Sequence, residues 1–165
     1  MNITEEPVSD EILGNIKDCA MSALGVLGDQ YASAKPEEVV KAIDQFAYRW
    51  QKGDRPHPDV IEDAEDVRLL FGGLWGEQLV KQFGWQWAQL TFHDYKDAVA
   101  FGVFSPDRSL AIYPLEFMLG CLRDADVDAT VLLSFNMLLA GSVPTMRKRS
   151  YTNVMDGVHR IVPRD

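Results

Sequence analysis

Few side chains of the 165-residue sequence stand at spacings that would support catalysis or metal binding. The three histidines, His57, His93 and His159, do not occur at the HxH or HxxxH spacing that directs two imidazoles to one metal ion. Cys19 and Cys121 lie in apolar runs, which is typical of small buried side chains. There is no Gly-x-Ser-x-Gly motif and no CxxC pair. We therefore predict no catalytic residue, no metal site and no cofactor, and expect a protein that is not an enzyme.

The strongest cluster of polar side chains is acidic. Glu62, Asp63, Glu65 and Asp66 crowd the predicted start of a helix, and Glu62 and Asp66 share one helical face at i, i+4 spacing. Carboxylates in a first turn interact favourably with the helix dipole, which is a simpler interpretation than a metal site. As a binding patch for a basic partner, these four residues are the first candidate.

Trp85 and Trp87 are the second candidate for partner binding. They are two residues apart, so their side chains point to one face of a strand. Core filling is the simpler interpretation. If that face is open, paired tryptophans would be strong anchors for a protein partner.

The charge of the chain excludes some partners. The formal net charge is -9 and the pI is about 4.7. Such a chain repels nucleic acids and anionic membranes, and the basic run 147–149 is too short to change this. Residues 1–83 carry sixteen acidic and eight basic side chains, whereas residues 84–165 carry nine and eight. We expect a basic protein partner to approach the N-terminal half. The N-terminus has no signal-peptide pattern, so we expect a cytoplasmic protein.

The elements that position these residues follow from hydrophobic periodicity, and they predict an α+β fold. Apolar residues at steps of three and four predict a helix over about 10–33, a second from Pro36 to about 52, and a third over 59–83 that Asp59 would cap. Three short antiparallel strands follow, at 85–92, 98–104 and 110–113, with short helices at 114–122 and 130–140. We expect one domain over 1–165, with 1–8 a flexible arm, 9–83 the helical half, and 84–165 the sheet with C-terminal helices.

Two local patterns have alternative readings. Gly72-Gly73-Leu74-Trp75-Gly76 lacks the Lys–Ser/Thr pair of a phosphate loop and lies within a helical pattern, which favours close helix packing. The strand 98–104 is apolar on both faces. This predicts either helices on both sides of the sheet or one exposed binding face.

Residues 70–115, about a quarter of the chain, resemble a family of small bacterial domains of unknown function. The resemblance is carried by Leu-Phe-Gly-Gly-Leu-Trp-Gly-Glu-Gln-Leu-Val-Lys-Gln-Phe-Gly-Trp-Gln-Trp at residues 70–87 and Ser-Pro-Asp-Arg-Ser-Leu-Ala-Ile-Tyr-Pro at residues 105–114. Such domains are also similar to immunity proteins of bacterial toxin systems. The resemblance implies tight binding of a partner without chemistry, and it transfers no site residues.

Three functional hypotheses follow from these observations. The first is an acidic protein-binding module, in its narrower form an immunity protein that neutralises a toxin. The second is a small-molecule binder or enzyme with a pocket between the sheet and the third helix, lined by Trp85, Trp87, Tyr95 and a buried carboxylate. The third is a structural subunit of a larger assembly.

Overall fold

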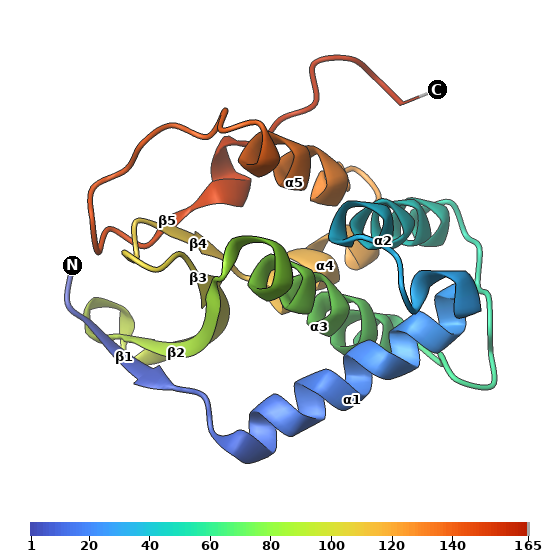
Figure 1. Cartoon of the computed structure of the whole chain (residues 1–165), viewed down its shortest axis with the longest axis horizontal. Helices are drawn as coiled ribbons and strands as arrows, with labels where there is room; N and C mark the ends of the chain where they lie inside the picture. Colours follow the sequence, from blue (N-terminus) through green and yellow to red (C-terminus); the bar gives the residue numbers. More distant parts are fainter. Residues whose placement is uncertain (165) are drawn as a thin grey trace.

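An α+β fold built from α-helices and one mixed sheet is seen in the computed structural model, which describes residues 1–164 (Figure 1). Asp165, the last residue of the predicted domain, lies outside the described residues. The helices are α1 (Asp10–Leu27), α2 (Pro36–Gln51), α3 (Ala64–Phe83), α4 (Pro114–Arg123) and α5 (Val131–Leu139). The strands are β1 (Ile3–Pro7), β2 (Gln86–Phe92), β3 (Ala98–Phe104), β4 (Leu110–Ile112) and β5 (Thr152–Asn153).

The sheet is larger than the predicted meander and is not purely antiparallel. Its order is β1-β2-β3-β4-β5. The predicted strands β2, β3 and β4 pair antiparallel in its centre, β1 adds antiparallel to β2, and β5 pairs parallel with β4. A parallel neighbour needs a long crossover, and here the chain passes through α4 and α5 before it returns to β4.

The prediction that residues 1–8 form a flexible arm is wrong. Ile3 to Pro7 pair with residues 88–92 as an edge strand, and the Glu5 carboxylate pairs with Arg108 at 2.7 Å between Oε1 and Nε. An edge strand has a neighbour on one side only and tolerates charged residues and proline. This segment therefore lacks the apolar alternation by which a central strand is predicted.

Two helix boundaries differ from their predictions because of local caps. The first helix ends at Leu27 rather than near residue 33, since Gly28 takes φ 123° and a separate 3₁₀ turn follows. The third helix begins at Ala64, five residues after Asp59, because the Asp63 side chain accepts the backbone N–H of Asp66. That bond satisfies one of the free donors of the first turn.

Helix α3 lies at the centre of the molecule, and its glycines let neighbouring elements approach closely (Figure 1). A Cβ added at Gly72 would lie 2.8 Å from the Leu115 side chain on α4. One added at Gly76 would overlap the Trp87 ring. The predicted close packing around the glycine cluster is confirmed.

The two faces of the sheet are covered differently. Trp87, Val103 and Ile112 belong to the large core that the sheet shares with the helices. On the other face, a small cluster around Leu90 and Phe104 is covered by tyrosines and other side chains outside the helices, and no helix residue belongs to it among residues 1–164. Neither predicted alternative, two helical layers or one open face, describes this arrangement in full.

Candidate functional site

The candidate site is a trough between α1 and α3 that extends to the start of β2. Its part nearest the sheet is a hollow of about 400 Å³, and a second hollow of about 450 Å³ continues along the two helices. Lys17, Glu77 and Val80 line both hollows, so the two are adjacent, and together we call them the trough. The sheet end is walled by Trp85 and Trp87, while the far end is apolar, with Ala20, Met21 and Leu24 along α1.

Glu77 is the chemically distinctive group in the trough. It is half-buried on α3, and it is the only charged residue between Arg68 and Lys81. Burial raises the pKa of its carboxyl group above the ordinary value, because the charged form loses hydration. The Lys17 ammonium group and the Trp87 indole lower that pKa, but by less than burial raises it. The sequence analysis missed Glu77, although a lone charge within an apolar helical stretch was an available signal.

The Trp87 indole N–H faces the same region. Its nitrogen is buried, and within residues 1–164 it has no hydrogen-bond partner. The indole therefore influences the Glu77 carboxyl without reaching hydrogen-bond geometry. A buried donor without a well-placed acceptor is unfavourable for folding.

The predicted tryptophan pair fills the core. Trp85 and Trp87 are 5% and 7% exposed, so they are not open anchors on a bare sheet face, and only the edges that line the trough are accessible. Tyr95, which the small-molecule hypothesis placed in the same pocket, is 65% exposed in the turn after β2 and does not line the trough.

An ion-pair network closes the trough at the sheet end. Arg108 donates to both carboxylate oxygens of Glu5, at 2.7 and 3.1 Å, and to the Gln86 amide oxygen at 3.0 Å. The Tyr151 hydroxyl also donates to Glu5 at 3.1 Å. The hydrogen bond from Arg108 is the main cause of the lowered pKa of Glu5. Arg108 and Tyr151 both have positive φ, 59° and 47°, which side chains of their size rarely adopt.

The predicted acidic cluster lies at the opposite end of α3 from Glu77, and most of it stabilises the helix start. Asp63 caps the helix, Asp66 accepts the Glu62 backbone N–H at 2.8 Å, and Glu65 pairs with Arg68 at 2.6 Å. Glu62 and Asp63 are both exposed and form no ion pair among the described residues, but Asp63 is used as the cap, so only the Glu62 side chain makes no polar contact there. The structure does not bring these four residues together with the tryptophans.

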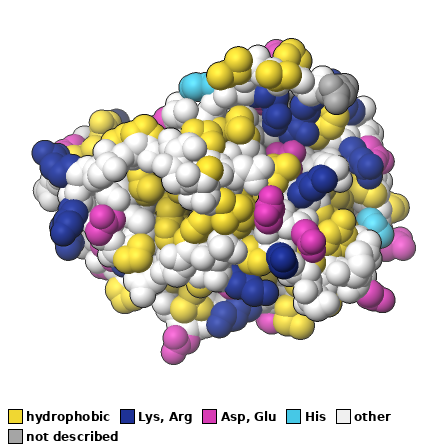
Figure 2. Space-filling view, turned by 45° about the horizontal axis from the view of Figure 1, so that its top comes forward, with side chains coloured by type: hydrophobic (Ala, Val, Ile, Leu, Met, Phe, Trp, Pro, Cys, Tyr) yellow, Lys and Arg dark blue, Asp and Glu magenta, His cyan; other side chains and the backbone are white. Residues whose placement is uncertain are grey.

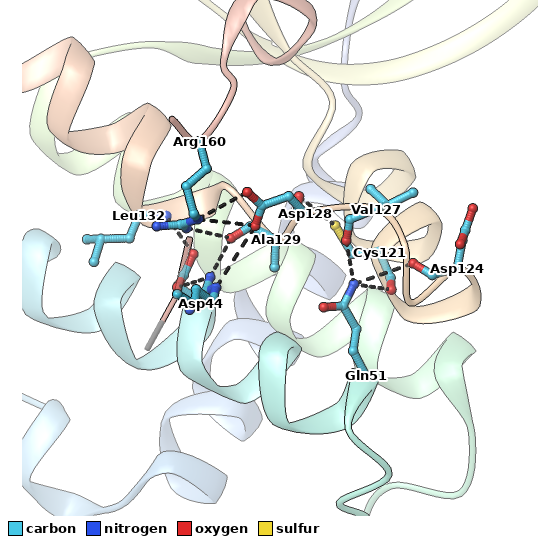
Figure 3. Close-up of polar contacts among 10 residues, drawn as sticks. Asp44, Gln51, Cys121, Asp124, Val127, Asp128, Ala129, Leu132 and Arg160 are labelled. Carbon is cyan, nitrogen blue, oxygen red and sulfur yellow. Dashed lines mark hydrogen bonds and ion pairs between the residues drawn. The ribbon is translucent and has the colours of Figure 1, made fainter. Parts of the chain in front are cut away.

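A second polar cluster joins α2 to α5 and to the last described residues (Figure 3). The Asp44 carboxylate is 3% exposed, accepts the backbone N–H of Leu132 at 3.0 Å and pairs with Arg164 at 2.6 Å. Nearby, Arg160 pairs with Asp128 at 3.0 Å. Arg164 Nε has no hydrogen-bond partner among the described residues and lies 3.9 Å from Asp128 Oδ1, but the carboxylates of the cluster are all paired from within the chain, which indicates a structural role.

Gln51 and Cys121 complete that cluster. The Gln51 amide donates to the backbone oxygens of Cys121 and Val127, at 2.8 and 2.7 Å, and so ties α2 to the loop after α4 (Figure 3). Burial is the main cause that raises the pKa of the Cys121 thiol to about 12. The thiol is therefore protonated at neutral pH and is not a nucleophile.

The surface does not show the acidity of the chain as one large patch on the face drawn in Figure 2. Hydrophobic side chains run across the middle of that face, and charged side chains of both signs lie around them. None of the helices in residues 1–164 has the length and hydropathy needed to span a bilayer. Within the same residues, no three His, Cys, Asp or Glu side chains are grouped as metal ligands would be.

Comparison with known proteins gives no relative that would bear on the trough. No protein-family model matches the chain. Neither the curated proteins nor the solved structures return a match. Only the geometry of this chain therefore bears on its function.

Proposed function

We propose that this protein is a cytoplasmic protein-binding module that holds a basic segment of a partner protein in the trough between α1 and α3. In the narrower form of this proposal, the protein is an immunity protein that neutralises a toxin by direct binding. The half-buried, incompletely compensated Glu77 is the observation that carries the proposal.

The shape of the trough favours a polypeptide segment as the ligand. Its two hollows share a wall and follow two packed helices from the sheet to Met21. An extended or helical segment fills such a groove with side chains at several points along its length. Met21 is 71% exposed, so the apolar end offers hydrophobic contact without rearrangement.

The charge of the trough favours a cation. A lysine or arginine of the partner would stabilise the charged form of Glu77, whose pKa burial raises. Lys17 is itself exposed and compensates the carboxylate only in part. The acidic excess of residues 1–83, which supply β1, α1 and α3, would steer a basic partner toward this side.

Trp87 adds an aromatic contact. The accessible edge of its ring lines the trough and would pack against an apolar part of the bound segment. Truncating an aromatic anchor in the centre of an interface commonly weakens binding by about 2 kcal/mol or more.

A small-molecule ligand in the same trough is the second candidate function. It is favoured by the meeting of Trp85, Trp87 and a partly buried carboxyl group between the sheet and α3, although Tyr95, which that hypothesis also placed there, does not line the trough. The open, two-part form of the trough favours the protein ligand over this alternative.

Affinity purification from source cells, with wild-type protein and Glu77→Gln as parallel baits, tests the proposal. Glu37→Gln is the matched control, because Glu37 is an exposed glutamate on α2 outside the trough. We expect wild type and control each to retain the same basic protein, in a fixed molar ratio to the bait. We expect roughly tenfold less on E77Q, a smaller effect than the loss of a fully buried charge pair gives, because Glu77 is only half-buried.

Three results would count against the proposal. Recovery of no stable partner, recovery of an acidic one, or equal retention by E77Q would each contradict it. Native mass spectrometry of the purified protein addresses the second candidate, since a small ligand lost in E77Q would replace the protein partner as the explanation of the trough.

A further inference from the structure

A separate cavity of about 230 Å³ lies where the end of α1, the middle of α2 and the connector 53–58 meet. It shares no lining residue with the trough. Five polar side chains of different chemistry line it together with apolar ones. The polar residues are Tyr31, Gln45, Arg49, Asp54 and His57.

These polar side chains are not engaged by the rest of the protein. Within residues 1–164, none of the five forms a side-chain hydrogen bond, and Arg49 and Asp54 form no ion pair although they line the same cavity. Neighbouring groups behave differently: Arg55 donates to the Trp50 carbonyl at 2.7 Å and lies 4.0 Å over the Trp50 ring. The folded chain thus uses Arg55 to hold the connector, while Arg49 and Asp54 are exposed and accessible to a ligand.

The connector is held rigidly over the cavity. His57 has φ 52°, a left-handed conformation that few non-glycine residues adopt. Prolines on both sides restrict it, and its carbonyl oxygen accepts the N–H groups of Val60 and Ile61 at 3.0 and 2.9 Å. The Asp54 N–H donates to the Arg49 carbonyl at 3.0 Å, which fixes these two residues relative to each other. Strained backbone of this kind tends to occur at binding sites.

The size and lining of the cavity define its ligand. A hollow of about 230 Å³ that is open to solvent suits a small polar ligand rather than a large one. A guanidinium group binds a carboxylate with paired hydrogen bonds, and a carboxylate binds an ammonium group. Val26, Leu27 and Phe46 provide an apolar lining for a short side chain.

We propose that this cavity is a binding site for a small zwitterion with the chemistry of a free amino acid, its carboxylate on Arg49 and its ammonium group on Asp54. His57, Tyr31 and Gln45 would contact the remaining polar atoms. The site is independent of the trough and of the partner proposed for it.

The test is calorimetric titration of the whole protein with each of the twenty free amino acids. Each ligand that binds is then titrated as its amide, which lacks the carboxylate, and as its N-acetyl form, which lacks the ammonium group. We expect at least one amino acid to bind with a Kd below about 1 mM. We expect both blocked forms to bind at least tenfold more weakly.

Two variants locate the site. Arg49→Gln and Asp54→Asn are expected to weaken binding at least tenfold, while Arg123→Gln and Asp18→Asn, exposed residues outside the cavity, should stay within twofold of wild type. Thermal melts check that the variants are folded. The proposal is overturned if no amino acid binds at about 10 mM. Blocked ligands that bind as well as free ones, or unchanged binding by folded R49Q and D54N, would also overturn it.

Discussion

Glu77 is placed in the trough at the expense of folding stability. Because its pKa is raised in the folded protein, the folded state is favoured below the unfolded pKa of 4.5, and this advantage is lost as the pH rises through the folded value. Glu77→Gln should therefore raise the melting temperature at pH 7, with a gain of less than about 1 kcal/mol in the free energy of unfolding. At pH 3.5 the melting temperature should stay nearly unchanged. Melting curves at the two pH values measure the difference. An equal shift at both would rule out titration of Glu77 as the cause.

Glu5 should behave in the opposite way. Its pKa is lowered by Arg108, so its stabilising contribution is present above the unfolded pKa of 4.5 and is lost as the pH falls through the folded value. Glu5→Gln should cost about 1–2 kcal/mol at pH 7, because Arg108 is left partly buried without its partner. Urea denaturation at pH 7 and pH 3 measures this loss. The exposed neighbour Glu6 is the control, and a loss in E6Q as large as in E5Q would contradict the assignment.

At the scale of elements, the glycines of α3 and α4 should respond with opposite sign to the same substitution. Gly76→Ala should destabilise the protein by about 1–3 kcal/mol, because the new methyl group displaces the Trp87 ring. Gly120→Ala adds its methyl group to open space in α4 and should stabilise by about 0.5–1 kcal/mol. Chemical denaturation of the two variants gives the comparison. A stabilised G76A would show that α3 and β2 are less tightly packed than the structure indicates.

Elements with a local signal could be predicted from the sequence, and elements formed by distant pairing could not. The predictions were accurate for α2, which begins at a proline, and for β3, whose apolar run ends at a turn. Strand β1 was missed because its partner β2 is more than eighty residues away and its own composition is polar. The same limit applies to the site: Trp85 and Trp87 stood out by spacing, whereas the contacts of Glu77 with Lys17 and Trp87 depend on three separate elements.

At the scale of the whole molecule, the acidic excess of the N-terminal half should act on the rate of association more than on affinity. Glu62→Gln removes an exposed charge there without breaking the cap of α3, and Asp126→Asn removes one from the near-neutral half. We expect E62Q to slow association with a basic partner more than D126N, and the difference to disappear in high salt. Stopped-flow binding at two ionic strengths measures both. Equal slowing by the two variants would show that the association rate depends on the total charge and not on where the charge lies.

The edge strand also determines the order in which the chain can fold during synthesis. Strand β1 leaves the ribosome before β2, its neighbour in the sheet, which ends at Phe92, and the Glu5–Tyr151 hydrogen bond joins residues 146 positions apart. Contacts between such distant residues form late, because a long loop must close before they are made. The nascent β1 segment therefore remains unpaired at least until β2 has been synthesised. Its glutamates and proline suit it for this interval, since charge and proline oppose pairing with the strands of other chains.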